Sequence, residues 1–500
     1  MRSNTQLKGN TNLSWFRVFI YVTILGGVFI RLFQLEWRSF WLDEAYLANI
    51  VVLENIDEIF NVNQYLNFAF PPPLFTTTLY LISNILQPNE FNLRLLPAIS
   101  GILCLPLVYK LTKSFFDEQT AAIALFLCSF NSIFIFFSKE LKQYTTEALF
   151  ALFAIYITER VIDNNRVRSF GYFLITCLLG FGFSHSFVFI FPILSIVICV
   201  NVINKRSILA YLNLIFGFIA FGIYYMFFLK KYIASKIIEF WTHAYVDYSS
   251  IPNFIWWHFE KTYSLFSAYS SFPKSLGILH EIYVLIILCI FFLGLYGCYK
   301  NQSRFLIYLI VPISLAYFLA LIHRYPVIPR TYLFILPLLL ITVAVGLRNL
   351  GFIIKIRIKS SLVLLAFFLF LGTSYAFKPV YKYIIFYDKE YMRVEQIRPV
   401  LDKVKINFRN DDLIHIHPRA SIAYKFYKSI LNKKVIYGNI SEYYFKDDIG
   451  KRLWIIFSHL NESQRKEYID YLDDKRDILL TIIEPGASAY LFDVPSTVEN

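Results

Sequence analysis

Charged residues are scarce in this sequence, and that scarcity indicates its class. Only 17% of the 500 residues are Asp, Glu, Lys or Arg, whereas a soluble domain carries about 25%. Glycine and proline number 18 each, too few for a collagen-like or disordered chain. All six cysteines lie within apolar stretches, which is typical of small buried residues and not of disulfides or a metal site. P-loop, GxGxxG, CxxC and HExxH patterns are missing, so nucleotide-driven transport, dinucleotide redox chemistry and zinc proteolysis have no support.

Apolar residues, in contrast, make up 57% of the chain, and the mean hydropathy is +0.52. These values predict a polytopic α-helical membrane protein. Runs of roughly membrane-crossing length indicate about 11 transmembrane helices, at 15–33, 93–110, 119–137, 145–162, 170–183, 186–203, 207–229, 279–299, 304–322, 331–347 and 360–377. The net charge of +13 is then explained by cytoplasmic loops and anionic membrane lipid, and nucleic acid is not expected as a partner.

The apolar stretch 74–86 decides the topology. It is too short to span a membrane and is predicted to lie at the outer surface as an interfacial helix. The basic start of the chain (Arg2, Lys8 and Arg17) predicts a cytoplasmic N-terminus, and with 74–86 at the outer surface the later basic clusters face the cytoplasm as the positive-inside rule requires. These clusters are Arg166/Arg168, Lys205/Arg206, Lys300/Arg304 and Arg348/Lys355/Arg357/Lys359. The acidic segment 36–91 becomes the first outer loop, with juxtamembrane helices, and the Trp- and Tyr-rich segment 230–278 becomes another.

The composition changes after residue 377, and we expect a domain boundary there. Residues 1–377 are predicted to form the membrane domain, and residues 378–500 a small extracytoplasmic α/β domain. Strand-like runs occur at 413–417, 453–457, 479–483 and 489–493, and helical runs at 421–431 and 462–472.

Three predicted outer segments carry ionisable groups, and the first is Asp43-Glu44 beside Trp41 and Tyr46. Two carboxylates held partly out of water by aromatic neighbours at the start of an interfacial helix suit a general base. They could also hold a divalent cation, Mg or Mn, although no cofactor is certain. The alternative, which the local features alone favour, is that the pair only complements the positive end of the helix dipole.

The second and third segments carry cations. Lys139, Glu140 and Lys142 lie in a loop that could hold an anionic lipid headgroup or could simply snorkel to the interface. Arg330 and Tyr332 follow His323-Arg324-Tyr325-Pro326, where Arg suits a bidentate phosphate contact and interfacial anchoring is the alternative. His185 is interpreted first as a structural histidine. His415 and His417 share one strand face and could bind a metal, but no further ligand lies nearby in the sequence.

In order, these segments resemble motifs of the GT-C membrane glycosyltransferases. The similarity is to glycosyltransferase family 39, with its protein O-mannosyltransferases and lipid A aminoarabinose transferases, and covers roughly residues 15–345. The matching segments are Asp43-Glu44, Phe70-Pro71-Pro72-Pro73-Leu74, Arg94-Leu95-Leu96-Pro97, Ser138-Lys139-Glu140-Leu141-Lys142-Gln143-Tyr144 and Tyr325-Pro326…Arg330-Thr331-Tyr332. Phe70 stands where many members have His, Lys139 where they have Gln, and Lys142 where they have Arg.

The resemblance implies a GT-C fold and transfer of a sugar from a polyprenyl-phosphate donor to an extracytoplasmic lipid, glycan or protein acceptor at the cell membrane. We expect displacement with inversion, in which Asp43 removes the acceptor proton while Glu44 and Glu140 orient the substrates. Cationic side chains would hold the donor phosphate, namely Lys139, Lys142, Arg330 and Arg94. Tyr144, His185 and Tyr332 are weaker candidates for substrate contacts.

Two other functions stay open from the sequence. One is a transporter or flippase for a lipid-linked saccharide, and the other is an O-antigen ligase or polymerase. Transporters place ionisable residues near the middle of the bilayer, often with inverted repeats. Here the acids gather at the predicted outer rim and no repeat is visible, which favours the glycosyltransferase.

Overall fold

The computed structural model describes residues 4–53, 59, 71–164, 167–202, 208–229, 241–357, 372, 375–376, 379–381, 395–437, 451–473 and 477–493. The chain folds into two compact units. The first, called the helical unit here, comprises Met1–Phe33, Phe60–Thr78 and Leu95–Phe386. The second, called the α/β unit, comprises Gln34–Ile59, Leu79–Arg94 and Tyr387–Asn500. Most of the predicted run 360–377 lies outside the described residues, as do Phe70, Arg166, Lys205, Arg206 and Lys359.

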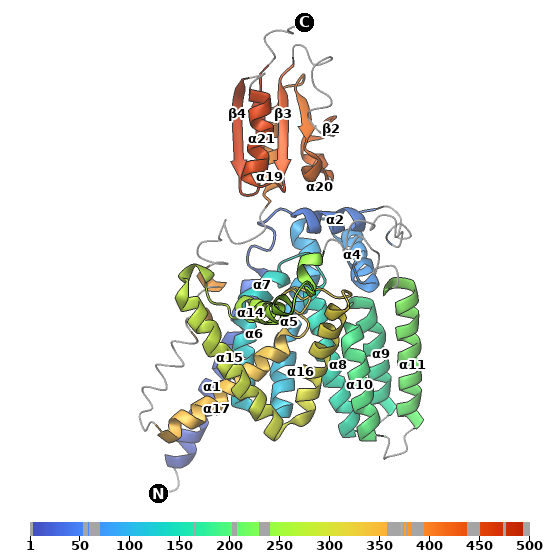
Figure 1. Cartoon of the computed structure of the whole chain (residues 1–500), viewed down its shortest axis with the longest axis vertical. Coiled ribbons are helices and arrows are strands. Elements are labelled where there is room, and N and C mark those ends of the chain that lie inside the picture. The colour runs from blue at the N-terminus through green and yellow to red at the C-terminus, as the bar shows by residue number, and fades with distance from the viewer. Residues whose placement is uncertain are drawn as a thin grey trace. The chain divides into compact units, whose positions relative to one another are not determined.

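Long apolar helices build the helical unit (Figure 1). Their bounds are α1 (Asn4–Leu32), α4 (Pro73–Ile85), α5 (Glu90–Phe115), α6 (Glu118–Phe130), α7 (Ser132–Ser138), α8 (Tyr144–Asn164), α9 (Val167–Phe183), α10 (Phe187–Val202), α11 (Ile208–Tyr224), α14 (Ile251–Tyr269), α15 (Ile278–Asn301), α16 (Ser303–Leu321) and α17 (Leu336–Arg357). Short turns of other helix types are η3 (Tyr225–Leu229), η4 (Thr242–Ala244) and η5 (Lys274–Leu276). The second half of α4, from Leu79, and the start of α5, up to Arg94, belong to the α/β unit.

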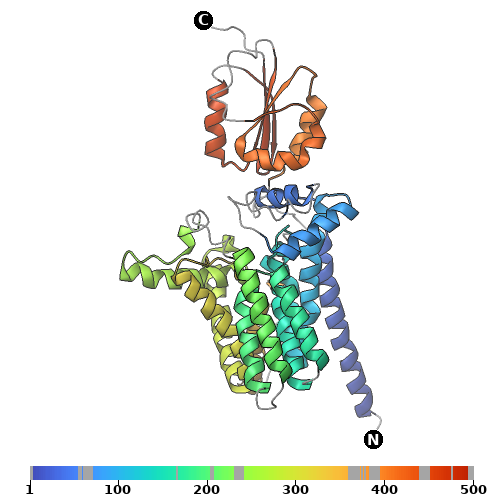
Figure 2. The same cartoon turned by 90° about the vertical axis from the view of Figure 1, so that its right-hand side faces the viewer.

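The apolar faces of these helices pack against one another to form one core. Helices α8, α9 and α10 lie side by side, with α11 against α9 and α10 (Figures 1 and 2). Helix α15 crosses α17 at Gly294 and Gly346. A Cβ built on Gly294 would lie 2.0 Å from the carbonyl oxygen of Thr342, and one on Gly346 would lie 1.9 Å from that of Ile290. Only glycine therefore allows the two backbones to approach this closely.

Four helices in the described part of the chain are long and apolar enough to cross a membrane, judged by length and composition: Trp15–Leu32, Glu90–Phe115, Ile278–Asn301 and Arg304–Leu321. Shorter apolar helices are Arg168–Phe183, Phe187–Asn201, Leu214–Phe227 and Leu336–Gly351. These features support a multi-pass membrane protein. The count of about 11 spans and the orientation of the termini stay predictions.

The predicted span 119–137 is not one continuous helix. Its two parts, α6 and α7, meet at Asn131 with a bend of 58°, so that they would make one broken span or a re-entrant loop. The Asn131 side chain accepts the amide hydrogen of Phe134 at 3.0 Å and so caps α7. It also donates to the carbonyl of Tyr269 and to the hydroxyl of Tyr375. A buried amide that satisfies a helix start in this way offsets the loss of helical bonds at the break.

The prediction of a helix over 331–347 also needs a correction. Residues 329–335 form turns, and α17 begins only at Leu336. Pro337 lacks an N–H group, so it fits the first turn of a helix and would break the interior of a longer one. The loop that carries Arg330 and Tyr332 is therefore longer than expected. The predicted short helix at 74–86 is present as α4.

A five-stranded sheet lies at the centre of the α/β unit. The strands are β1 (Leu413–Ile416), β2 (Ile436–Tyr437), β3 (Leu453–Ser458), β4 (Ile478–Glu484) and β5 (Ala487–Phe492), and their order is β2-β1-β3-β5-β4. Strands β1, β2 and β3 run parallel, whereas β5 is antiparallel to β3 and to β4. Every residue of β3 and of β5 is buried, as expected for strands covered on both faces.

The covering helices are α19 (Ile397–Asn407), α20 (Ser421–Leu431) and α21 (Glu462–Asp473). Figure 2 shows the sheet on edge, with α21 on one side and α20 on the other. A short 3-10 turn, η7 (Pro418–Ala420), precedes α20. The strand-like and helical runs seen in the sequence correspond to β1, β3, β4, β5, α20 and α21, whereas β2 and α19 were not predicted. Helix α2 (Leu42–Val51), from the first predicted outer loop, also belongs to this unit and packs on α20.

Candidate active site

Both predicted catalytic carboxylates of the first segment lie in the first turn of α2. The chain enters this helix through Trp41 in an extended conformation, and the Trp41 side chain makes no capping bond. Asp43 is half-buried, whereas Glu44 is completely buried. Acidic groups in a first helical turn are stabilised by the helix dipole. The two neighbours nevertheless differ in access, and Asp43 is the one of the pair that a substrate can reach.

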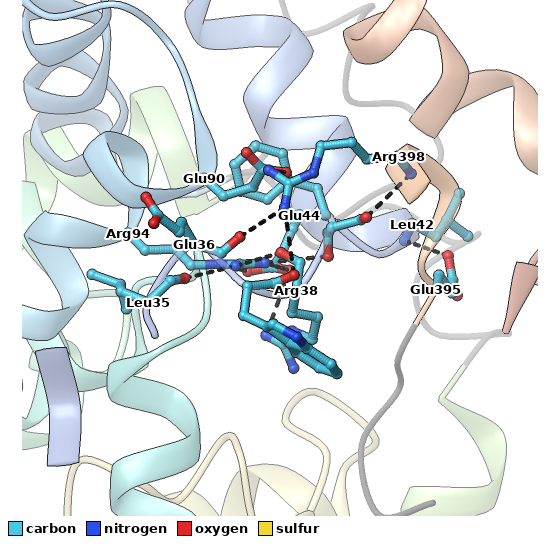
Figure 3. Close-up of polar contacts among 12 residues, drawn as sticks. Leu35, Glu36, Arg38, Leu42, Glu44, Glu90, Arg94, Glu395 and Arg398 are labelled. Carbon is cyan, nitrogen blue, oxygen red and sulfur yellow. Dashed lines mark hydrogen bonds and ion pairs between the residues drawn. The ribbon is translucent and has the colours of Figure 1, made fainter. Parts of the chain in front are cut away.

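Glu44 is paired with Arg94, which lies near the start of α5 (Figure 3). Arg94 Nε meets Glu44 Oε1 at 2.9 Å and Arg94 Nη2 meets Glu44 Oε2 at 2.7 Å. Arg38 Nη2 lies 3.5 Å from the same Oε2 atom. All three side chains are almost inaccessible to solvent. A two-armed guanidinium–carboxylate pair is geometrically specific, so it fixes the orientation of the first turn of α2.

The remaining N–H groups of Arg94 donate to backbone carbonyls. Nη1 donates to the oxygens of Leu35 and Arg38, at 3.0 and 2.7 Å. Nη2 also donates to that of Ser39, at 3.3 Å. With Nε and Nη2 on Glu44, every N–H of the guanidinium has an acceptor within the protein. A phosphate would have to displace these bonds, so the geometry favours a positioning role for Arg94 over the predicted contact with the donor.

Glu90, one turn before Arg94, is bonded to two residues of the C-terminal part of the chain. Arg398 Nη1 lies 2.9 Å from Glu90 Oε1, and the Tyr427 hydroxyl donates to the same oxygen at 2.8 Å. Burial and the Glu90 carboxylate raise the pKa of Tyr427 well above its usual value, so its hydroxyl keeps its proton. That hydroxyl in turn accepts the backbone N–H of Phe40 at 2.8 Å. Sequence reasoning missed these partners, because Arg398 and Tyr427 belong to no motif.

The predicted cationic loop between α7 and α8 belongs to the helical unit. Lys139 is 7% exposed, and its ammonium donates to the carbonyl of Phe33 at 2.6 Å. Lys142 is half-buried and Glu140 is buried, with the Lys142 amide bonded to the Glu140 carbonyl at 2.7 Å. Tyr144 begins α8 and packs edge-on against Phe137. Lys139 therefore helps to hold the end of α1, and Lys142 is the more accessible of the two cations.

Arg330 and Tyr332 lie in the turns before α17. The Arg330 guanidinium stacks 4.8 Å from the centre of the Trp241 ring, a cation–π contact that restricts its position. Tyr332 is only 2% exposed and packs against the rings of Tyr325 and Tyr317. This burial favours a structural role for Tyr332, whereas Arg330 is partly exposed.

A buried carboxylate that sequence reasoning missed contacts the His185 segment. Glu147 accepts the His185 amide at 3.2 Å and the Ser186 hydroxyl at 3.1 Å. The His185 ring nitrogen Nδ1 is hydrogen-bonded to the Tyr224 hydroxyl. A glutamate within the apolar run 145–162 is itself a signal, because ionisable residues inside a membrane segment have a role or a partner. Here Glu147 ties α8 to the turn before α10, and the contact with Tyr224 restrains the His185 ring.

Arg94 engages both carboxylate oxygens of Glu44, so a divalent cation at Asp43 and Glu44 would have to compete with Arg94 for this acid, and cation binding there stays a prediction. His415 lies in β1, which ends at Ile416. His417 follows directly: its N–H still donates to the carbonyl of Ile456 in β3 at 3.1 Å, and its side chain caps the η7 turn. Within the described ranges, no group of three or more His, Cys, Asp or Glu side chains could hold a metal ion.

Asp43 belongs to the α/β unit, whereas Lys139, Lys142 and Arg330 belong to the helical unit. A sugar transfer that uses Asp43 as the base and these cations as the phosphate site needs them in one pocket, and that arrangement stays a prediction. Within the α/β unit itself, Asp43 stands on a helix whose first turn is fixed by a buried ion pair. Within the helical unit, Lys142 and Arg330 are partly exposed cations in two loops.

Comparison with known proteins gives two findings. A family model described as dolichyl-phosphate-mannose-protein mannosyltransferase matches residues 71–227, less than a third of the chain. The match includes Pro71–Leu74 and the segments that begin at Arg94 and Ser138, but not Asp43 or the segment 325–332. No curated protein sequence matches the chain.

Among solved structures, ArnT from Cupriavidus metallidurans in the apo state is similar with a TM-score of 0.54 at 11% identity, and the match covers 96% of this chain and 98% of that chain. ArnT from the same organism bound to undecaprenyl phosphate gives a TM-score of 0.51 at 11% identity, with the same coverage. At this identity the likeness shows the fold, along nearly the whole chain. The fold is that of the GT-C membrane glycosyltransferases, and together with the family model it supports the superfamily of protein mannosyltransferases and ArnT for this chain.

Proposed function

We propose that this protein transfers a sugar from a polyprenyl-phosphate donor to an extracytoplasmic acceptor, and that it does so with inversion at the anomeric carbon. The observation that carries the proposal is the GT-C fold along 96% of the chain, with the Asp43-Glu44 pair at the start of α2. The solved ArnT structure bound to undecaprenyl phosphate supports a donor of the same class.

In the proposed reaction Asp43 accepts the proton of the acceptor hydroxyl. The acceptor oxygen forms a bond to the anomeric carbon while the bond from that carbon to the phosphate oxygen breaks. The bonding electrons leave with polyprenyl phosphate, which departs as an anion and needs no strong general acid. Lys142 and Arg330 stabilise the charge that develops on the phosphate. Glu44 acts through its ion pair with Arg94 and so positions Asp43.

The decisive experiment uses the purified protein in lipid vesicles with a radiolabelled polyprenyl-phosphate sugar and a mixture of lipid and peptide acceptors. Wild-type protein should transfer the label, and Asp43→Asn should abolish transfer while leaving folding and membrane insertion intact. Asp402→Asn makes the same chemical change at an exposed position of α19 and should leave transfer unchanged. Near-normal turnover by Asp43→Asn would remove Asp43 from the base role. Movement of the labelled lipid across the bilayer without transfer would instead identify a flippase.

A further inference from the structure

The loop before α2 is held by side chains from the C-terminal part of the α/β unit. Its backbone N–H groups at residues 39, 40 and 42 all donate to such side chains, as Figure 3 shows for Leu42. Ser39 donates to Gln396 Oε1 at 3.0 Å, and Phe40 donates to the Tyr427 hydroxyl at 2.8 Å. Backbone groups that leave water must find partners, and here those partners come from a distant part of the chain.

The contact nearest to the proposed base is made by Glu395. The Leu42 N–H, the first of α2, donates to Glu395 Oε2 at 3.1 Å. The first N–H groups of a helix have no partner within it, and Trp41 supplies no side-chain cap. Glu395 therefore serves as the missing cap, with its charge at the positive end of the helix dipole. Asp43 directly follows Leu42 in the sequence.

Glu395 is itself held in place from the sheet. Its Oε1 atom is hydrogen-bonded to His459 Nδ1 at 2.6 Å, and its Oε2 atom accepts the Ser458 hydroxyl at 3.4 Å. His459 adopts a left-handed backbone conformation, with φ of 60°, which is costly for a residue other than glycine. Glu395 is 6% exposed, and both of its carboxylate oxygens are hydrogen-bonded, so its side chain is held in one position.

The neighbouring residues fasten the same loop. The Arg398 amide donates to Ser39 Oγ at 3.2 Å, and the Arg398 guanidinium donates to the carbonyl of Glu36 at 3.2 Å. Together with the Arg398–Glu90 ion pair, these bonds link residues 395–398 to the loop before α2 and to the start of α5. Glu44 lies just after the first of these segments, and Arg94 just after the beginning of the second.

We infer that Glu395 is a positioning residue for the proposed reaction: by capping α2 from the C-terminal part of the chain, it holds Asp43 in the orientation that proton transfer needs. This inference rests on the proposed function. It assigns to the C-terminal part of the chain a direct effect on the chemical step, in addition to any part in binding the acceptor.

The test compares Glu395→Ala, Glu395→Gln and Glu484→Ala in the full chain, in lipid vesicles. Glutamine keeps an oxygen that can accept the Leu42 N–H, whereas alanine does not. Glu484 pairs with Lys403 at the surface of the same unit, so Glu484→Ala removes one carboxylate without touching α2. Because a small displacement of a reacting group is costly, we expect Glu395→Ala to lower kcat by about 10- to 100-fold with an unchanged KM for the donor. Glu395→Gln should recover most of that loss, and Glu484→Ala should match the wild type.

A second measurement does not depend on activity. Hydrogen exchange in the peptide that covers residues 40–46 should become faster by about tenfold in Glu395→Ala and stay unchanged in Glu484→Ala, because only the first removes the acceptor of the Leu42 amide. Faster exchange with unchanged kcat would overturn the positioning role, and so would a lower kcat without faster exchange or without recovery in Glu395→Gln. A wild-type protein that transfers no sugar would instead refute the proposed function, and the exchange data would then still show whether Glu395 holds α2.

Discussion

Glu44 and Arg94 meet through two parallel hydrogen bonds of 2.7 and 2.9 Å in a place that water does not reach. One partner follows the proposed base directly in the sequence, and the other lies 50 residues away on α5. This relationship converts a motif of two adjacent acids into one accessible acid and one structural acid. Charge alone could not distinguish them.

Breaking this pair should destabilise the protein strongly. Arg94→Met leaves the Glu44 carboxylate buried beside Arg38 alone, and loss of one partner of a buried pair costs about 3–5 kcal/mol. Arg94→Lys keeps the charge without the fork and should fall between Arg94→Met and the wild type. Thermal unfolding of the detergent-solubilised protein measures the effect. Lys403→Met breaks an exposed pair worth about 0–1 kcal/mol and provides the control. Equal shifts in Tm for Arg94→Met and Lys403→Met would contradict the structural role.

Lys142 should affect the donor more than the fold. Because this side chain is half-buried in the loop before α8, Lys142→Ala should raise the KM for the polyprenyl-phosphate sugar by about tenfold, the effect of one charge-assisted hydrogen bond. Lys142→Arg should bind the donor at least as well as the wild type, since it adds a second donor group in a fork. Lys113→Ala, at an exposed pair with Glu118, is the matched control. An unchanged donor KM in Lys142→Ala would place the phosphate elsewhere.

The α/β unit should lose stability in mild acid because of His417. Burial, and then the charge of Arg419, lowers the pKa of His417 to about 4. The pKa of a histidine in the unfolded chain is about 6.5. The folded state therefore prefers the neutral ring. The free energy of unfolding has its full value above about pH 6.5 and falls as the pH drops towards 4. His417→Asn can still cap η7 and should flatten this part of the curve. Hydrogen exchange of β1 and β3 at several pH values measures it, and an identical slope in both proteins would exclude His417 as the cause.

The crossing of α15 and α17 should tolerate no side chain at its centre. Gly346→Ala places a methyl group against the carbonyl of Ile290, and overpacking of this kind costs about 1–3 kcal/mol. Gly222→Ala lies in α11 with open space around it and should be neutral or slightly stabilising. Thermal unfolding of both variants tests the comparison. A loss of stability in Gly222→Ala as large as in Gly346→Ala would show that helix propensity, and not the close approach, controls the result.

Hydropathy and local pattern were sufficient for most helices of the helical unit and for most of the sheet, but not for α14, which lies in the segment 230–278 that was predicted only as an outer loop. An apolar run has the same composition whether or not it bends, however, so the break at Asn131 was missed: it depends on where one amide finds the carbonyl of Tyr269 and the hydroxyl of Tyr375. The two-residue strand β2 was too short to leave a pattern of its own.

The candidate site was predictable only where it is local in sequence. Asp43 stood out because two acids begin a helix beside aromatic residues. The different fates of Asp43 and Glu44 depend on Arg94, and the cap of α2 depends on Glu395, which is 353 residues from Leu42. No periodicity or spacing relates positions so far apart, and a lone glutamate in a charge-dense segment carries no signal.

The dependence of the loop before α2 on Glu395, Gln396 and Tyr427 also concerns the order of synthesis. The ribosome makes residues 39–42 early, but their amides must wait for partners that emerge more than 350 residues later. Until then water must satisfy these groups, and the first turn of α2 has no cap. A chain that ends before residue 395 would thus lack the acceptors of these three amides. The first turn of α2 can be completed only after the C-terminal part of the chain has been made.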